Sequence, residues 1–137
     1  MTEDRHDHGL AELVALAREA SAHAYSPYSG ARVGAAVQCT DGRTFSGCNV
    51  ENASYGLTQC AERNALNAAI AAGVPPRSMP ALAIHASGFK KLAPCGACRQ
   101  VMSELLADDA VVLCSNEGGE VERWRMVDLL PSPFVLE

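Results

Sequence analysis

Three cysteines and one glutamate have the residue types and spacing of a reactive site. Cys95 and Cys98 form a Cys-x-x-Cys pair, and Cys60 lies upstream of them with Glu62 two residues further on. A Cys-x-x-Cys pair alone is compatible with a metal site, a redox dithiol or two buried small side chains. Catalytic zinc usually takes three protein ligands and keeps the fourth position for water. Because no fourth ligand lies at suitable spacing, the pattern favours an open, catalytic zinc site.

The charge of such a site needs compensation. Three thiolates on Zn²⁺ leave a net charge of −1, which opposes the acidification of a bound water. Cys60 and Cys95 each lie at the start of a predicted helix, so free N–H groups at the helix N-termini would stabilise the thiolates. Arg63 has two readings, a solvated helix cation or a donor to a thiolate, and the second suits this context.

Glu62 can act as a proton carrier only under one geometric condition. Side chains two residues apart on a helix face different directions, so Cys60 and Glu62 approach one metal only if Cys60 lies at the helix mouth. There Glu62 would take a proton from water and return it to a substrate nitrogen. An isolated glutamate in a first turn would instead be an ordinary dipole-stabilising residue.

The remaining cysteines and the histidines have simpler interpretations. His6 and His8 fall in residues 1–8, which we expect to be a flexible tail, while His23 and His85 are more typical of exposed or satisfied imidazoles. The three other cysteines lie in or at the ends of strand candidates and are expected to be buried: Cys39, Cys48 and Cys114.

The elements that must hold these residues alternate between helix and strand. Apolar periodicity predicts helices over about 9–23, 60–72 (with Thr58 as the cap) and 96–106. Strand candidates cover 33–39, 44–48, 81–86, 111–114 and 121–126, and Asp41-Gly42 predicts a hairpin between the first two. This order predicts a single α/β domain over residues 1–137, with an open sheet covered by helices.

Composition excludes several other classes. The 137 residues are 48% hydrophobic and 20% charged, which is ordinary globular composition. A net charge of −5 argues against an extended basic surface for polynucleotides. We expect no membrane span and no export segment, and therefore a cytoplasmic protein whose cysteines are reduced.

The order of cysteine, glutamate and Pro-Cys-x-x-Cys matches the signature of the zinc deaminases. Within that class the sequence resembles the small, homotetrameric cytidine deaminases. The resemblance runs from about Tyr25 to Phe134 and is carried by these segments: Tyr25-Ser26-Pro27-Tyr28-Ser29, Val33-Gly34-Ala35-Ala36, Gly47-Cys48-Asn49-Val50-Glu51-Asn52-Ala53-Ser54-Tyr55, Cys60-Ala61-Glu62-Arg63, Pro94-Cys95-Gly96-Ala97-Cys98-Arg99-Gln100 and Leu129-Leu130-Pro131.

The resemblance implies a three-layer fold around a five-stranded mixed sheet. It also implies one zinc ion per chain, held by Cys60, Cys95 and Cys98, and hydrolysis of cytidine and deoxycytidine to the uracil nucleosides with release of ammonia, as in pyrimidine salvage. Zinc would activate water for attack on C4 of cytosine, and Glu62 would move the protons.

The same resemblance assigns substrate contacts. It implies that Asn49 and Glu51 hydrogen-bond the ribose hydroxyls. It also implies that the Ala61 N–H donates to the pyrimidine carbonyl and that the Ala93 carbonyl accepts from the exocyclic amine. Tyr55 and Phe134 correspond to residues that complete the site of a neighbouring subunit, so the resemblance implies a homotetramer with shared sites.

Two departures keep other readings open. Ala31 stands where family members commonly have a phenylalanine against the pyrimidine, and Ala93 where Ser or Thr is frequent. The loss of ring contact would weaken nucleoside binding by about 1 to 3 kcal/mol, or admit a modified base, as in blasticidin S deaminase. A non-catalytic zinc module or nucleic-acid binder is the alternative from another class, and the missing fourth ligand and the negative charge count against it.

Overall fold

One mixed sheet with the strand order β2-β1-β3-β4-β5 organises the chain. The computed structural model describes residues 2–88 and 92–136, and within residues 2–8 only the backbone. The strands are β1 (Val33–Gln38), β2 (Thr44–Cys48), β3 (Ala81–Ala86), β4 (Val111–Asn116) and β5 (Val121–Arg125). β3 and β4 are parallel, and the other neighbouring pairs are antiparallel.

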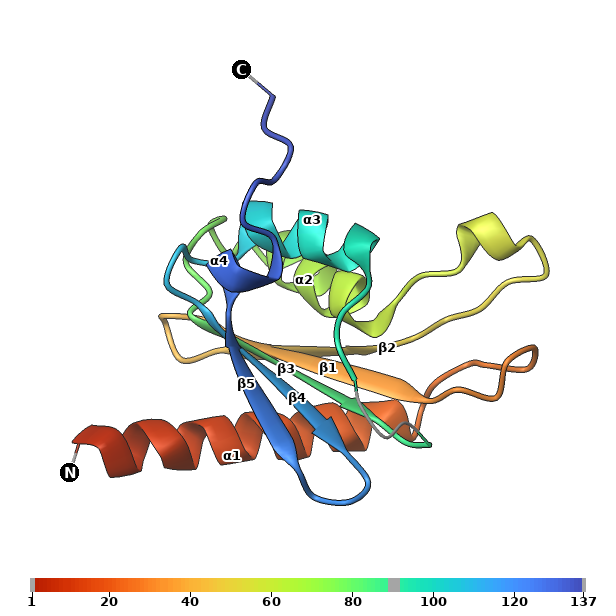
Figure 1. Cartoon of the computed structure of the whole chain (residues 1–137), viewed down its shortest axis with the longest axis horizontal. Coiled ribbons are helices and arrows are strands. Elements are labelled where there is room, and N and C mark those ends of the chain that lie inside the picture. Colours follow the sequence, from red (N-terminus) through yellow and green to blue (C-terminus); the bar gives the residue numbers. More distant parts are fainter. Residues whose placement is uncertain (1, 89–91, 137) are drawn as a thin grey trace.

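Helices cover both faces of this sheet. α1 (Thr2–Ser21) lies along one face, while α2 (Ala61–Ala71) and α3 (Gly96–Leu105) lie side by side on the other, where the short α4 (Met126–Leu129) packs near α3 (Figure 1). A 3₁₀ turn, η1 (Tyr55–Leu57), precedes α2. The expected three-layer α/β fold with a five-stranded mixed sheet is therefore confirmed.

The core follows from the alternation of side chains along the central strand. Leu82 and Ile84 face α2 and α3, whereas Ala81 and Ala83 face α1. All six residues of β3 are buried, as expected for a strand covered on both faces. Two apolar layers result; Cys98 belongs to the layer beneath α2 and α3, and Cys60 packs against it.

Two glycines let the helices approach the sheet closely. A Cβ on Gly34 would lie 1.9 Å from the Ala17 carbonyl oxygen of α1. A Cβ on Gly47 would lie 2.6 Å from the Ala65 nitrogen and 2.9 Å from the Ala61 oxygen of α2. Gly47 therefore fixes how deeply the start of α2, which carries Glu62, sits on the sheet.

The structure differs most from the sequence prediction at the start of α1, at α4 and at the cap of α2. α1 begins at Thr2 instead of about Gly9, and the residue types at positions 2–4 (Thr, Glu, Asp) are favourable at a helix N-terminus. The flexibility of residues 1–8 stays a prediction. α4 was not predicted, because its four residues are too few to show a helical period.

The cap of α2 is Cys60 and not Thr58. Val50 and Gln59 form an antiparallel bridge that keeps this segment extended up to the helix. The Thr58 hydroxyl instead accepts a hydrogen bond from the Asn52 backbone N–H.

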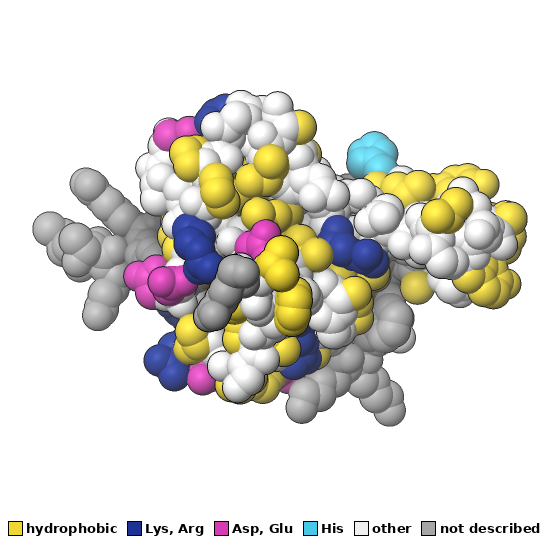
Figure 2. Space-filling model, turned by 90° about the horizontal axis from the view of Figure 1, so that it is seen from above, with side chains coloured by type: hydrophobic (Ala, Val, Ile, Leu, Met, Phe, Trp, Pro, Cys, Tyr) yellow, Lys and Arg dark blue, Asp and Glu magenta, His cyan; other side chains and the backbone are white. Residues whose placement is uncertain are grey.

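An arm projects from the sheet beside the start of α2. It consists of the loops 25–32 and 50–59; a bridge between Tyr25 and Val50 joins the two loops, and a bridge between Val50 and Gln59 joins the ends of the second. Figure 2 shows hydrophobic side chains gathered over it, and its exposed apolar residues are Tyr25, Tyr28, Val50, Tyr55 and Leu57. The C-terminal segment also extends away from the body and exposes Phe134, Val135 and Leu136 (Figure 1).

Among the helices that the structure describes, none has the length and apolar character to cross a membrane.

Candidate active site

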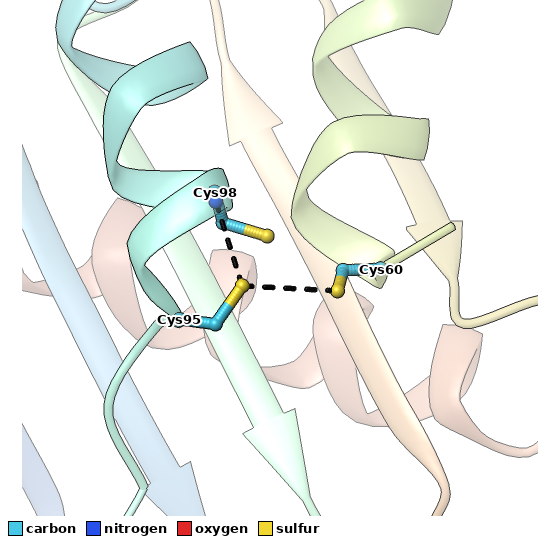
Figure 3. Close-up of side chains that lie close together, drawn as sticks. All are labelled: Cys60, Cys95 and Cys98. Atoms are coloured by element: carbon cyan, nitrogen blue, oxygen red, sulfur yellow. Dashed lines mark hydrogen bonds between the residues drawn. The ribbon is translucent and has the colours of Figure 1, made fainter. Parts of the chain in front are cut away.

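The three predicted metal ligands converge at the paired N-termini of α2 and α3. Cys60 is the N-cap of α2, Cys95 is the N-cap of α3, and Cys98 lies in the first turn of α3. Figure 3 shows their sulfurs pointing toward one another. The three Sγ atoms lie within 4.8 Å of one another, and those of Cys60 and Cys95 are 4.0 Å apart.

This geometry fits zinc. Zinc–thiolate bonds of about 2.3 Å in a tetrahedral arrangement place two sulfurs about 3.8 Å apart. Sulfur ligands at both helix mouths also lie where backbone N–H groups face them, as the Cys98 N–H does toward Cys95 Sγ at 3.5 Å. Within residues 9–88 and 92–136, these cysteines are the one group of metal-ligating side chains that we find.

The environment of Cys60 favours its thiolate. A hydrogen bond from the Cys98 thiol and another from the Arg63 guanidinium lower the pKa of Cys60 to about 5. The pKa of Cys98 is raised, because it donates to Cys60 and is buried. The cluster thus already holds one thiolate at neutral pH, as a ligand for a cation requires.

Glu62 lies beside the sulfurs without belonging to their set. It is in the first turn of α2 and only 5% exposed. Burial raises the pKa of its carboxyl, the nearby Cys60 charge raises it further, and a hydrogen bond with Cys98 opposes these effects. Cys60, as the N-cap, has extended backbone, so the helical i, i+2 divergence does not separate Cys60 from Glu62. The condition set for a proton carrier is met.

The Arg63 guanidinium donates a hydrogen bond to the sulfur of Cys60. Its Nη2 donates to Cys60 Sγ at 3.2 Å, so the reading of a solvated cation is not the observed one. Its Nε is buried and has no hydrogen-bond partner. A guanidinium at this distance offsets part of the negative charge of three thiolates.

The side chains of Asn49 and Glu51 are held by hydrogen bonds to other residues of the same chain. The Asn49 amide accepts from the Val33 N–H at 2.9 Å and donates to the Ala31 carbonyl at 2.8 Å. The Glu51 carboxylate accepts from the N–H groups of Tyr28 and Ser29 and from the Ser29 hydroxyl. These hydrogen bonds, above all the one from Ser29, lower the pKa of Glu51 and keep it charged.

The other predicted contacts divide into two groups. Ala61 is the first residue of α2, so its N–H has no partner within the helix, and Ala93 is exposed just before the Pro94-Cys95 peptide. Both lie close in sequence to the cysteine cluster. Tyr55 and Phe134 are 74% and 71% exposed, on the arm and on the C-terminal segment, and neither is buried in its own chain.

The structure gives contacts to two residues, Arg99 and Gln100, to which the sequence analysis assigned no role of their own. Arg99 donates from Nε to the Pro94 carbonyl at 2.7 Å and from Nη1 to the Leu129 carbonyl at 3.0 Å. Gln100 exchanges two hydrogen bonds with the backbone of Phe134. Their partners lie in distant or irregular segments, so no local pattern indicated them.

Comparison with known proteins fits this geometry. The family model described as "Cytidine and deoxycytidylate deaminase zinc-binding region" matches residues 8–114. The chain belongs to this family. A cytidine deaminase of Halalkalibacterium halodurans is 45% identical over 91% of this chain and 93% of its own length. Another from Sporosarcina psychrophila is 42% identical over 92% of this chain and 91% of its own.

Solved structures of the cytidine deaminase family agree with the fold. The crystal structure of a cytidine deaminase from Burkholderia pseudomallei has a TM-score of 0.87 and 48% identity, covering 90% of this chain and 98% of that one. The one from Mycobacterium tuberculosis has a TM-score of 0.78 and 41% identity, covering 93% and 98%. The family resemblance noted in the sequence and the expectation of a zinc site are both confirmed.

Proposed function

We infer that the chain is a zinc-dependent cytidine deaminase, which hydrolyses cytidine and deoxycytidine to uridine and deoxyuridine with release of ammonia. The observation that carries this inference is the cluster of three thiols with a buried carboxylate, Glu62, beside it. A structural zinc site would need a fourth ligand and no proton carrier. Family membership and the cytidine deaminases it resembles support the same reaction.

Each residue of the site has a task in this reaction. Zinc, when bound by Cys60, Cys95 and Cys98, supplies an acidified water as the nucleophile. Glu62 has a pKa raised by burial, which suits a group that must both accept and donate a proton near neutral pH. It takes one proton from water and gives it to N3 of the base, then takes the second proton of that water from the new C4 hydroxyl and gives it to the amine, which leaves as ammonia.

Backbone groups orient the base for this transfer. The Ala61 N–H donates to the pyrimidine carbonyl, and the Ala93 carbonyl accepts from the exocyclic amine. Asn49 and Glu51 bind the ribose hydroxyls, and their existing hydrogen bonds hold them in place for it. Arg63 keeps the thiolate charge from opposing the acidification of water.

The Glu62→Gln variant tests the reaction. We expect it to retain one zinc per chain, measured by elemental analysis, and to lose turnover of cytidine, followed by the ultraviolet change. Glu19→Gln, an exposed change on α1 at the opposite face, is the matched control and keeps full activity. Near-normal activity of Glu62→Gln would remove Glu62 from the mechanism.

We also propose that residues 1–137 act as one domain that assembles as a homotetramer with shared sites. The exposed apolar residues of the arm and the C-terminal segment support this, because surfaces of this kind typically bind other chains. Mixing Glu62→Gln with Phe134→Ala chains tests it. A mixed assembly has sites in which intact Glu62 meets an intact neighbouring Phe134, so activity should exceed that of either variant alone. A monomer in sedimentation experiments, or no gain on mixing, would contradict sharing.

The small side chain at Ala31 keeps a second substrate class, cytosine nucleosides with a modified base, as an alternative to cytidine. Ala31 is a small residue on the loop that Asn49 holds, where the resemblance places a ring. Turnover of cytidine, deoxycytidine, base-modified analogues and blasticidin S, measured side by side, decides between the two.

We further propose a cytoplasmic role in pyrimidine salvage. Six free cysteines support a reducing compartment.

A further inference from the structure

We propose that Arg99 is a positioning residue for the metal site. It holds the peptide between Pro94 and Cys95 and anchors it to the end of α4. The inference rests on the proposed function only in that Cys95 is taken as a zinc ligand.

The first contact lies directly beside the ligand. Arg99 Nε donates to the Pro94 carbonyl at 2.7 Å. That carbonyl belongs to the peptide unit that ends at the Cys95 nitrogen, so fixing it fixes the plane from which the Cys95 side chain projects. A guanidinium donor makes this bond shorter and stronger than a neutral one.

The second contact gives the guanidinium its own anchor. Arg99 Nη1 donates to the carbonyl of Leu129 at 3.0 Å, and Leu129 is the last residue of α4 and is buried. Carbonyls at a helix end lack intrahelical donors, so this one is available to Arg99. The planar fork of Arg99 thereby joins two segments that are far apart in the sequence.

The next residue adds to the same junction. Gln100 donates from Nε2 to the Phe134 carbonyl at 2.9 Å and accepts from the Phe134 N–H at 3.3 Å. One turn of α3 therefore carries a ligand, Cys98, a side chain that fixes a second ligand, Cys95, and a clamp on the C-terminal segment. Ala93, the expected acceptor for the substrate amine, lies one peptide before the carbonyl that Arg99 holds.

Zinc affinity of the substrate-free protein, measured by competition with a colorimetric chelator, tests this role. Arg99→Lys keeps the charge but cannot reach both carbonyls with one fork, and Arg99→Ala removes both bonds. Losing a side chain that orients a ligand typically weakens metal binding by about tenfold or more, so we expect affinity to fall in the order wild type, Lys, Ala.

Two controls separate positioning from general stability. Leu13→Val perturbs the core on the α1 face, away from the cysteines, and should lower the melting temperature without weakening zinc binding. Gln100→Ala frees Phe134 but leaves both Arg99 bonds, and should also retain zinc affinity. Arg99→Lys with wild-type affinity, or Leu13→Val with an equal loss, would overturn the proposal. Because no substrate is used, failure of the proposed deamination would leave this result readable.

Discussion

The contact between Gly47 and α2 leads to a prediction that joins stability to the active site. A methyl group on Gly47 would lie 2.6 Å from the Ala65 nitrogen and 2.9 Å from both the Ala61 oxygen and Asn64 Cβ. The nearest of these contacts is about 0.8 Å shorter than ordinary van der Waals contact. Two of the three atoms are helix backbone, so α2 itself must move away from the sheet in Gly47→Ala.

The expected cost follows from this overlap. Overpacking a core typically costs about 1 to 3 kcal/mol. Replacing glycine also restricts the unfolded chain, which returns about 0.4 to 1 kcal/mol. We therefore expect Gly47→Ala to lose about 2 kcal/mol and to melt about 6 to 10 °C below wild type. Because the displaced segment carries Cys60 and Glu62, kcat/KM on cytidine should fall as well.

Two matched glycines make the prediction specific. Gly34→Ala would place its methyl 1.9 Å from the Ala17 oxygen on the opposite face, so it should destabilise at least as much but leave zinc affinity unchanged. Gly9 lies within α1, and a methyl group there would have its nearest contact at 3.7 Å, with Gln38 Nε2. Gly9→Ala should therefore raise the melting temperature slightly. Calorimetry, steady-state kinetics and chelator competition for zinc on the three variants check this. A Gly47→Ala protein that melts like wild type with full kcat/KM would refute the reasoning.

Three further predictions concern single side chains. Burial lowers the pKa of His85, whose Nδ1 lies 2.9 Å from the Ser115 hydroxyl oxygen, so the folded state favours the neutral ring. Stability should be full above the unfolded pKa of about 6.5 and fall as pH drops toward the folded value. Urea midpoints against pH check this, and an identical slope in His85→Gln would contradict it. Asn49→Ala leaves the Val33 N–H and the Ala31 carbonyl without their side-chain partner and should cost about 2 kcal/mol with a raised KM, whereas Asn49→Asp keeps the acceptor and should lose less. Arg63→Gln should weaken zinc binding about tenfold in chelator competition, with Arg63→Lys intermediate, and unchanged affinity in both would speak against its charge role.

Local pattern was enough to predict most of the fold. Apolar periodicity and short apolar runs placed α2, α3 and all five strands within a few residues, because an element covered on one face shows its own period and β3, covered on both faces, is apolar throughout. The cysteine spacing predicted a shared site, because both cysteine groups precede helices and helix mouths attract thiolates. The cluster of three sulfurs confirms that part.

Long-range pairing decided what the sequence could not indicate. The N-cap of α2 is Cys60 and not the predicted Thr58, because Gln59 pairs with Val50 and keeps the chain extended up to Cys60. The role of Arg99 depends on a carbonyl 30 residues away, which no spacing rule connects to it. The substrate roles of Asn49, Glu51 and the neighbouring-subunit residues stay predictions that the variants above test.

Zinc K-edge X-ray absorption on the metal-loaded protein tests the central claim most directly. The account predicts three sulfur neighbours at about 2.3 Å and one oxygen at about 2.0 to 2.2 Å from water. Four sulfur neighbours with no oxygen at the shorter distance would contradict a site open to solvent.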